Sequence, residues 1–134
     1  MENKTFNLFV YGTLKKNQIA NHYLKDAKFI GNATTKDSIF DMKSNRGYYP
    51  FVFLNGNKDI MGEIYEVPME KLKDLDAYEG YSPDGNGLYL RNVFDYVLEN
   101  GQDIKAIMYY QKDNKYNLKD MTNVELIGNN FIWK

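Results

Sequence analysis

Short segments in which apolar residues run together, or alternate with polar ones, dominate this chain and predict β-strands. The first, residues 7–11, is almost wholly apolar and ends at Gly12, as a buried strand does. Later segments also have the length and pattern of strands, and they are residues 28–35, 39–42, 50–54, 60–67, 88–98 and 102–110. The 12 Tyr and 8 Phe residues favour strands too, because aromatic side chains suit a pleated, half-buried surface.

Two of the gaps between these strands carry residues typical of tight turns. Asn55-Gly56-Asn57-Lys58 separates residues 50–54 from residues 60–67, and Asn100-Gly101 separates the last two strands. Asn and Gly readily adopt the positive φ angles that hairpin turns require. The sequence therefore predicts a β-hairpin at each gap.

One segment has the periodicity of a helix instead. Apolar residues recur every three positions over residues 69–78, and charged residues fill the other side. Pro68 suits the first position of a helix, and Gly80 suits a left-handed stop directly after Glu79. A second, shorter helix is expected at residues 18–25.

These elements predict an α+β fold that consists mainly of strands. The tail from residue 111 is polar until Phe131-Ile132-Trp133, and a terminal Trp usually docks on the body of a protein. We expect a single domain, residues 1–134, in which a few helices pack on a strongly bent mixed sheet or partial β-barrel.

Composition excludes several classes of protein. The chain has 134 residues, 43% of them hydrophobic, so it is long enough to bury a core. It has no cysteine, which removes disulfides, thiolate nucleophiles and cysteine-based metal sites. No apolar run reaches membrane-spanning length, and Met1-Glu2-Asn3-Lys4 lacks the apolar core of a secretion signal. A cytoplasmic location without a membrane partner is expected.

Charge and motifs narrow the chemistry further. The formal net charge is -1, and Lys15-Lys16, the nearest approach to a basic cluster, is too small to bind phosphate backbones. No nucleic-acid partner is therefore expected. The single histidine, His22, cannot form a two-histidine metal site, and a structural role is favoured for it. Serine-hydrolase, phosphate-loop and dinucleotide motifs do not occur, so neither a metal nor a cofactor is expected.

Two places remain for chemistry. At Tyr11-Gly12-Thr13-Leu14 a strand breaks at a glycine, which exposes backbone N–H groups that can hold a carboxylate or an oxyanion. From this motif alone, an ordinary turn is the favoured interpretation. Glu79 ends the predicted helix between aromatic residues, where the helix dipole and burial should both raise its pKa, as suits a general base. The alternative is a solvated glutamate at a helix end.

Together, in this order, the two places resemble the gamma-glutamylcyclotransferase-like family. The family's opening motif, Tyr-Gly-Ser/Thr-Leu and a basic residue, is similar to Tyr11-Gly12-Thr13-Leu14-Lys15, and its Leu-Asp-x-x-Glu-Gly signature is similar to Leu75-Asp76-Ala77-Tyr78-Glu79-Gly80. Many members have Gly where this chain has Asn17. Weaker similarities are Asn21-His22, Leu24, Phe29-Ile30-Gly31, Tyr49-Pro50, Gly62-Glu63-Ile64-Tyr65, Tyr89-Leu90-Arg91 and Ala106-Ile107-Met108-Tyr109.

The resemblance implies an enzyme that cyclises a γ-glutamyl unit to 5-oxoproline and releases the attached amine or amino acid. It implies Glu79 as the general acid and base, without metal or cofactor. The substrate-binding residues would be Tyr11, Gly12, Thr13, Leu14 and Tyr109, although a packing role is favoured for the two tyrosines. A non-catalytic module that binds a small ligand in the same pocket is the alternative.

The group attached to the γ-glutamyl unit is expected to contact the variable loops, residues 43–49 and 82–88. Candidate contacts are Arg46, Tyr48, Tyr49 and Tyr81. Arg91 could meet an anionic substrate, but an ion pair on a strand is favoured for it. The sequence identifies neither the γ-glutamyl compound nor the oligomeric state.

Overall fold

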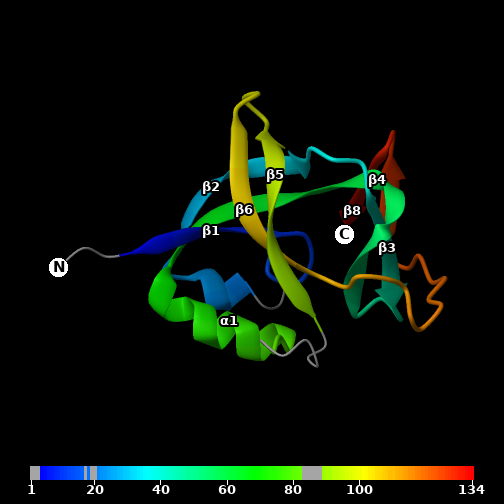
Figure 1. Ribbon diagram of the computed structural model, residues 1–134, viewed down its shortest axis with the longest axis horizontal. Helices are drawn as coiled ribbons and strands as arrows, with labels where there is room; N and C mark the ends of the chain where they lie inside the picture. Colours follow the sequence, from blue (N-terminus) through cyan, green and yellow to red (C-terminus); the bar gives the residue numbers. More distant parts are fainter. Residues whose placement is uncertain (1–3, 17, 19–20, 83–88) are drawn as a thin grey trace.

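The computed structural model describes residues 4–16, 18, 21–82 and 89–134 (Figure 1). In chain order the elements are β1 (Thr5–Val10), the 3₁₀ helix η1 (Asn21–Leu24), β2 (Lys28–Thr35), β3 (Phe40–Asn45), β4 (Tyr49–Pro68), the 3₁₀ helix η2 (Met69–Lys71), α1 (Leu72–Glu79), β5 (Leu90–Leu98), β6 (Asp103–Tyr110), β7 (Val124–Ile127) and β8 (Asn130–Trp133). The predicted α+β fold, in which strands dominate, is confirmed.

The sheet is organised around β4, the longest strand. β4 runs antiparallel to β1, β2 and β3 and parallel to β8. The sheet continues from β2 through β5 to β6, and β6 meets β1 in a short parallel contact at Leu8 and Ile107. The mixed sheet thus curls back toward its first strand and forms a partial β-barrel, as predicted, rather than a closed one.

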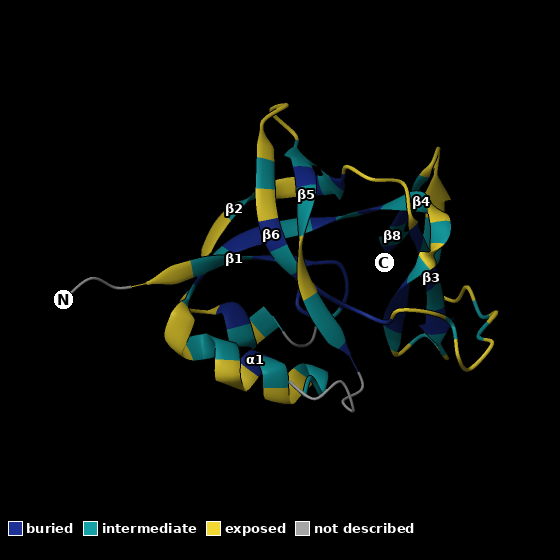
Figure 2. Cartoon of the chain, in the orientation of Figure 1, coloured by how far each residue is buried: buried dark blue, intermediate teal, exposed yellow. Residues whose placement is uncertain are grey.

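Strand β1 is buried on both faces over its C-terminal half, which explains its continuous apolar sequence. Phe9 packs in one core cluster with residues such as Ile64. Its neighbours Leu8 and Val10 pack in a second cluster that includes Leu75 of α1. Figure 2 shows β1 becoming buried toward its C-terminal end, and α1 with both exposed and less exposed positions. The end of β1 is therefore held firmly from both sides.

Two local predictions are confirmed in detail. β5 and β6 form the hairpin at Asn100-Gly101, where Gly101 has a φ of 87° and the Leu98 N–H donates to the Gln102 carbonyl over 2.8 Å. Helix α1 ends at Glu79, because Gly80 adopts a left-handed φ of 73°. The Tyr81 N–H then donates to the Asp76 carbonyl over 2.9 Å, which is the Schellman arrangement of helix ends.

The predicted hairpin at Asn55-Gly56-Asn57-Lys58 is wrong, because β4 runs through it without turning back. β3 pairs with β4 on both sides of this stretch, with Phe40 opposite Lys58 and Asp41 opposite Phe53, so the residues between bulge outward. The Gly56 N–H donates to the Ile39 carbonyl over 3.1 Å. A Cβ at Gly56 would lie 2.1 Å from the Phe40 carbonyl oxygen. The glycine therefore permits a close approach of two strands, not a turn.

The helices are shorter than predicted. The expected helix at 18–25 is only the 3₁₀ turn η1 within the described residues, and residues 17, 19 and 20 lie outside them. The expected helix after Pro68 begins as η2 and becomes α-helical at Leu72. The variable loop expected at residues 82–88 falls mostly on residues 83–88, which also lie outside the described part of the chain.

The C-terminal tail docks as predicted, but through strands that were not expected. Trp133 is 2% exposed, and β8 adds to the sheet beside β4 at Asp59 and Ile60. β7 and β8 have four residues each, too few for an alternating pattern to indicate a strand.

We expect Gly56→Ala to lower the free energy of unfolding by about 2–3 kcal/mol, because the new methyl group would force β3 and β4 apart. Gly31→Ala is the matched control in the same sheet, since its Cβ would lie 3.5 Å from a Leu98 methyl group, an ordinary contact. Urea unfolding of both variants measures the difference. Equal stability of the two would contradict the close approach at Gly56.

Candidate active site

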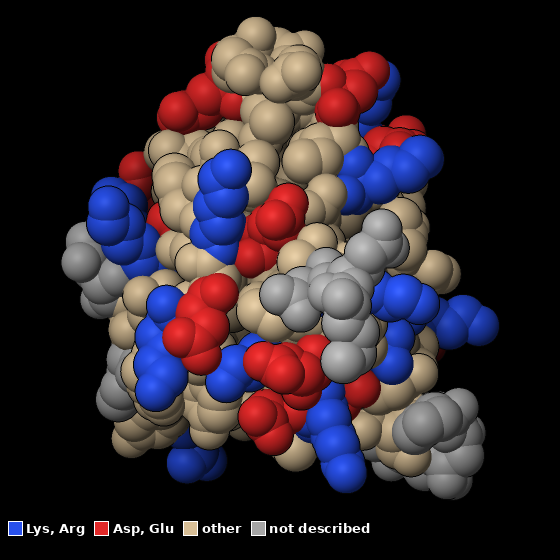
Figure 3. Space-filling model, turned by 90° about the vertical axis from the view of Figure 1, so that its left-hand side faces the viewer, with Lys and Arg blue, Asp and Glu red and all other residues tan. Residues whose placement is uncertain are grey.

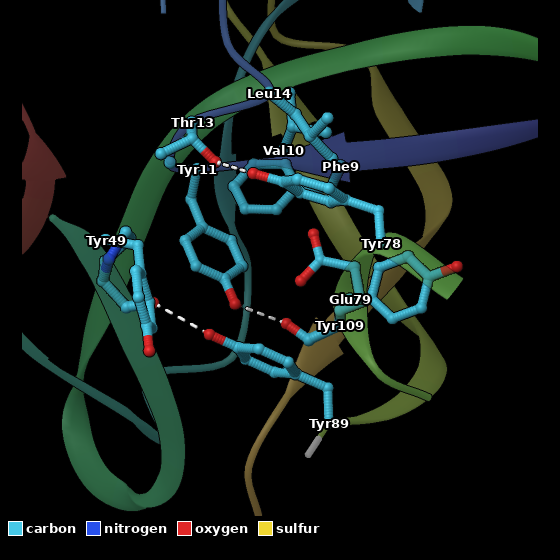
Figure 4. Close-up of a pocket in the computed structure, with 12 residues that line it drawn as sticks. Phe9, Val10, Tyr11, Thr13, Leu14, Tyr49, Tyr78, Glu79, Tyr89 and Tyr109 are labelled. Carbon is cyan, nitrogen blue, oxygen red and sulfur yellow. Dashed lines mark hydrogen bonds between the residues drawn. The ribbon is translucent and has the colours of Figure 1, made fainter. Parts of the chain in front are cut away.

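One cavity of about 310 Å³ brings together all the residues predicted for the site (Figure 4). It lies where the end of β1, the start of β4, the end of β6 and the C-terminus of α1 meet. The predicted residues that line it are Tyr11, Gly12, Thr13, Leu14, Glu79 and Tyr109. The structure adds lining residues that the sequence did not identify as site residues: Phe9, Val10, Pro50, Tyr78 and Tyr89, with Tyr49 foreseen only as a candidate contact.

Residues 11–16, which follow β1, form the 11–16 turn at one wall of this cavity. The Lys15 N–H donates to the Gly12 carbonyl over 3.0 Å and closes the turn. A Cβ at Gly12 would lie 2.7 Å from the ring of Pro50, so only glycine lets the two segments pack this closely. Within the described part of the chain, the N–H groups of Gly12, Thr13 and Leu14 donate no hydrogen bond. These backbone donors are therefore available to an anionic group.

The carboxylate of Glu79 points into the cavity toward the ring of Tyr11 (Figure 4). Burial raises the pKa of Glu79 to about 7, which agrees with the predicted direction. No described residue donates a hydrogen bond or forms an ion pair with this carboxylate. A buried acid without a partner is rare in a structural role and suits proton transfer near neutral pH.

Two buried tyrosines next to Glu79 donate hydrogen bonds from their hydroxyl groups to backbone carbonyls. The Tyr11 hydroxyl donates to the Tyr109 carbonyl over 2.6 Å, and the Tyr89 hydroxyl donates to the Pro50 carbonyl over 3.1 Å. Burial raises the pKa of both phenols well above the ordinary value, so they stay neutral. Because each hydroxyl proton already takes part in a hydrogen bond to a carbonyl, these oxygens can only accept hydrogen bonds from a group in the cavity. A cationic donor such as an ammonium group suits such acceptors.

The hydroxyl of Tyr109 is directed away from the cavity. It donates to Asp76 over 2.5 Å, while its ring forms part of the cavity wall. Arg91 also binds Asp76, with its Nε 3.0 Å from the carboxylate, and stacks over the ring of Tyr81 at 4.3 Å. The ion pair favoured for Arg91 is thus present, but it joins β5 to α1. These contacts attach the end of α1, and so Glu79, to the sheet.

The other candidates have different outcomes. Tyr49 lines the cavity. Arg46, Tyr48 and Tyr81 do not line it, and Tyr48 is 72% exposed. The ring of His22 packs 4.5 Å from that of Tyr23, consistent with a structural role. The Tyr78 hydroxyl lies 2.7 Å from the Thr13 hydroxyl and links α1 to the 11–16 turn.

Three of the lining residues missed from the sequence had signals there. Tyr89 begins the Tyr89-Leu90-Arg91 motif, Pro50 ends the Tyr49-Pro50 motif, and Tyr78 precedes Glu79 on the helix. The rest are ordinary strand residues that reach the cavity only through tertiary folding.

The described residues offer little basis for other kinds of site. In the ranges 4–16, 18, 21–82 and 89–134, His, Asp and Glu form no group of three that could hold a metal ion. No helix in these ranges is long and apolar enough to cross a membrane. On the face shown in Figure 3, the coloured basic and acidic side chains are interspersed rather than gathered into a single-sign patch.

Comparison with known proteins defines the class. The crystal structure of an AIG2-like protein from Mus musculus has a similar fold, with a TM-score of 0.71, 26% sequence identity and coverage of 87% of this chain and 85% of that one. This similarity puts the chain in a class of small α+β proteins with a curled mixed sheet. In the candidate site of this chain, Glu79 lies across the cavity from the 11–16 turn.

The sequences identify the family. A putative gamma-glutamylcyclotransferase from Methanocaldococcus jannaschii is 38% identical over 110 residues, covering 80% of this chain and 85% of that protein. Gamma-glutamylaminecyclotransferase A from Danio rerio is 36% identical over 113 residues, covering 77% and 67%. The chain belongs to the gamma-glutamyl cyclotransferase, AIG2-like family, whose model matches residues 8–126.

We expect Glu79→Gln to change the pH dependence of stability. Because burial disfavours the ionised form, the folded state binds the Glu79 proton more tightly than the unfolded state, whose pKa is 4.5. The stability of the parent therefore falls as pH rises from 4.5 through about 7. Relative to Glu79→Gln, the parent should lose about 1–3 kcal/mol between pH 5 and pH 8. Urea unfolding of both proteins at the two pH values measures this loss. If the difference in free energy of unfolding between the two proteins is the same at both pH values, the pKa of Glu79 is not raised.

Proposed function

We propose that this chain catalyses the cyclisation of a γ-glutamyl unit to 5-oxoproline with release of the amine attached to it. The observation that carries the proposal is the carboxylate of Glu79, which has no partner among the described residues. Burial raises its pKa to about 7, which allows it both to accept and to return a proton near neutral pH. Membership of the gamma-glutamyl cyclotransferase family supports the same reaction.

The reaction needs one group that moves a proton twice. In the first step, Glu79 takes a proton from the α-ammonium of the substrate, and the freed amine nitrogen attacks the γ-carbonyl carbon. A carbon–nitrogen bond forms, and the carbonyl oxygen takes the negative charge. The attacking nitrogen still carries two protons after this bond forms and is positively charged. In the second step, protonated Glu79 gives its proton to the leaving nitrogen, the bond to that nitrogen breaks and the carbonyl re-forms. The ring nitrogen then passes its extra proton through Glu79 to the released amine, which leaves as an ammonium. Since nucleophile and electrophile belong to one molecule, the enzyme need only hold the folded conformer.

The cavity offers a complementary place for each charged group of the γ-glutamyl unit. The α-ammonium would lie between Glu79 and the lone pairs of the Tyr11 and Tyr89 hydroxyls, which accept hydrogen bonds from it. The α-carboxylate or the developing oxyanion would accept hydrogen bonds from the free N–H groups of Gly12 to Leu14. No metal or cofactor has a step in this reaction.

For the leaving group, we favour an amine over an amino acid. Among the described lining residues, none is Lys or Arg, so the extra carboxylate of a γ-glutamyl amino acid would meet no side-chain cation. The Danio rerio relative is named a gamma-glutamylaminecyclotransferase, which agrees with this choice. A module that only binds ligands would gain nothing from an unpaired buried carboxylate, which costs stability.

We expect Glu79→Gln to lower kcat about 10²–10⁴-fold, because the amide keeps the size of the side chain but cannot take the proton. Asp74→Asn is the control, since Asp74 lies on the same helix but is exposed to solvent. In the parent, kcat/KM should rise with pH through about 7, as Glu79 becomes ionised. Release of 5-oxoproline is followed by chromatography. Parental activity in a folded Glu79→Gln protein would show that Glu79 is not the base.

We expect a γ-glutamyl alkylamine to be cleaved with a kcat/KM at least about 10-fold above that of a γ-glutamyl amino acid with the same carbon skeleton. The reason is that the second substrate buries an unpaired carboxylate, at a cost on the order of 1–3 kcal/mol. Parallel assays of the two compounds measure the ratio. A ratio below one would reverse the substrate preference. Thermal stabilisation by both compounds without any 5-oxoproline would instead indicate a binding module.

A further inference from the structure

The 11–16 turn is held from the side away from the cavity by a glutamate of β4. The Glu63 carboxylate accepts a hydrogen bond from the Lys16 N–H over 2.8 Å and another from the Tyr65 hydroxyl over 3.1 Å. Burial, with Glu63 beside it, raises the pKa of Tyr65 to about 12, so this phenol remains a donor. Glu63 is half-buried and does not line the cavity. Its contacts therefore act on the turn and not on a ligand in this cavity.

Neighbouring residues of the same turn are fixed by different elements. The Asn21 amide in η1 donates to the Leu14 carbonyl over 2.8 Å. The buried Lys15 ammonium donates to the Trp133 carbonyl of β8 over 2.5 Å. Three successive residues of the turn are thus bonded to η1, β8 and β4, while the N–H groups of Gly12 to Leu14 have no acceptor among the described residues.

We propose that Glu63 is a positioning residue for substrate binding, which keeps the backbone donors of the 11–16 turn in place through its bond to the Lys16 N–H. This inference rests on the proposed function, in which those donors bind the γ-glutamyl unit. Backbone donors have no rotamers of their own, so only the conformation of the turn determines where they point. A fixed acceptor behind the turn sets that conformation.

The experiment compares Glu63→Ala with Glu63→Gln, because the Gln side-chain oxygen can still accept the bond from Lys16. We expect Glu63→Ala to raise KM for a γ-glutamyl alkylamine about 10-fold, with kcat within about 3-fold of the parent and an unchanged pH midpoint. Glu63→Gln should stay close to the parent in both constants. Glu66→Ala, which removes the same charge from the same strand without touching the turn, is the control.

Hydrogen exchange of the Lys16 amide provides a measurement that needs no turnover. We expect this amide to exchange at least about 10-fold faster in Glu63→Ala than in the parent, and at nearly the parental rate in Glu63→Gln. Unchanged exchange or unchanged KM in Glu63→Ala would overturn the inference. So would a Glu63→Gln protein as impaired as Glu63→Ala. The role of Glu63 would then be its negative charge, which favours the charged form of the nearby Lys15, and not its hydrogen bond to Lys16. Failure of the parent to release 5-oxoproline would overturn the proposed function instead, while the exchange rates still decide whether Glu63 holds the turn.

Discussion

The site depends on one constraint, which is that the carboxylate of Glu79 is shielded from solvent and has no hydrogen-bond or ion-pair partner among the described residues. Such a group destabilises the folded protein whenever it is ionised. The rest of the fold must therefore hold α1 in place from several directions. Leu75 anchors the helix in the core, and Gly80 ends it so that Glu79 is its last residue. Asp76, bonded to Arg91 and Tyr109, attaches the same turn of helix to two strands.

Asp76 and Glu79 show how two carboxylates three residues apart can be given different roles. Asp76 accepts bonds from a guanidinium and a phenol, and these contacts are structural. Glu79 faces a cavity in which the neighbouring tyrosines donate their protons elsewhere. One acid fixes the helix end, and the other is left reactive. Environments that separate two nearby acids in this way are typical of sites that transfer protons.

The sequence predicted what depends on local chemistry. The stop at Gly80, the hairpin at Gly101 and the strand break at Gly12 each follow from residues within a few positions, and each is present. Asn55-Gly56 has the same local signal, but pairing of β4 with β3 overrides it and uses the glycine for close packing. The contact between Gly12 and Pro50, and the meeting of Tyr11 with Glu79 in one cavity, join segments far apart in the sequence, and no local pattern indicates either.

The neutral walls of the cavity and the backbone donors of the 11–16 turn follow from one requirement. A Lys or Arg beside Glu79 would bind the substrate carboxylate well, but its charge would lower the pKa of Glu79 and weaken it as a base. N–H groups carry no full charge, so they can bind an anion while leaving that pKa near 7. Recognition of the anion then depends on the conformation of a turn. In the proposed reaction, that is why a carboxylate outside the cavity, Glu63, should affect binding more than chemistry.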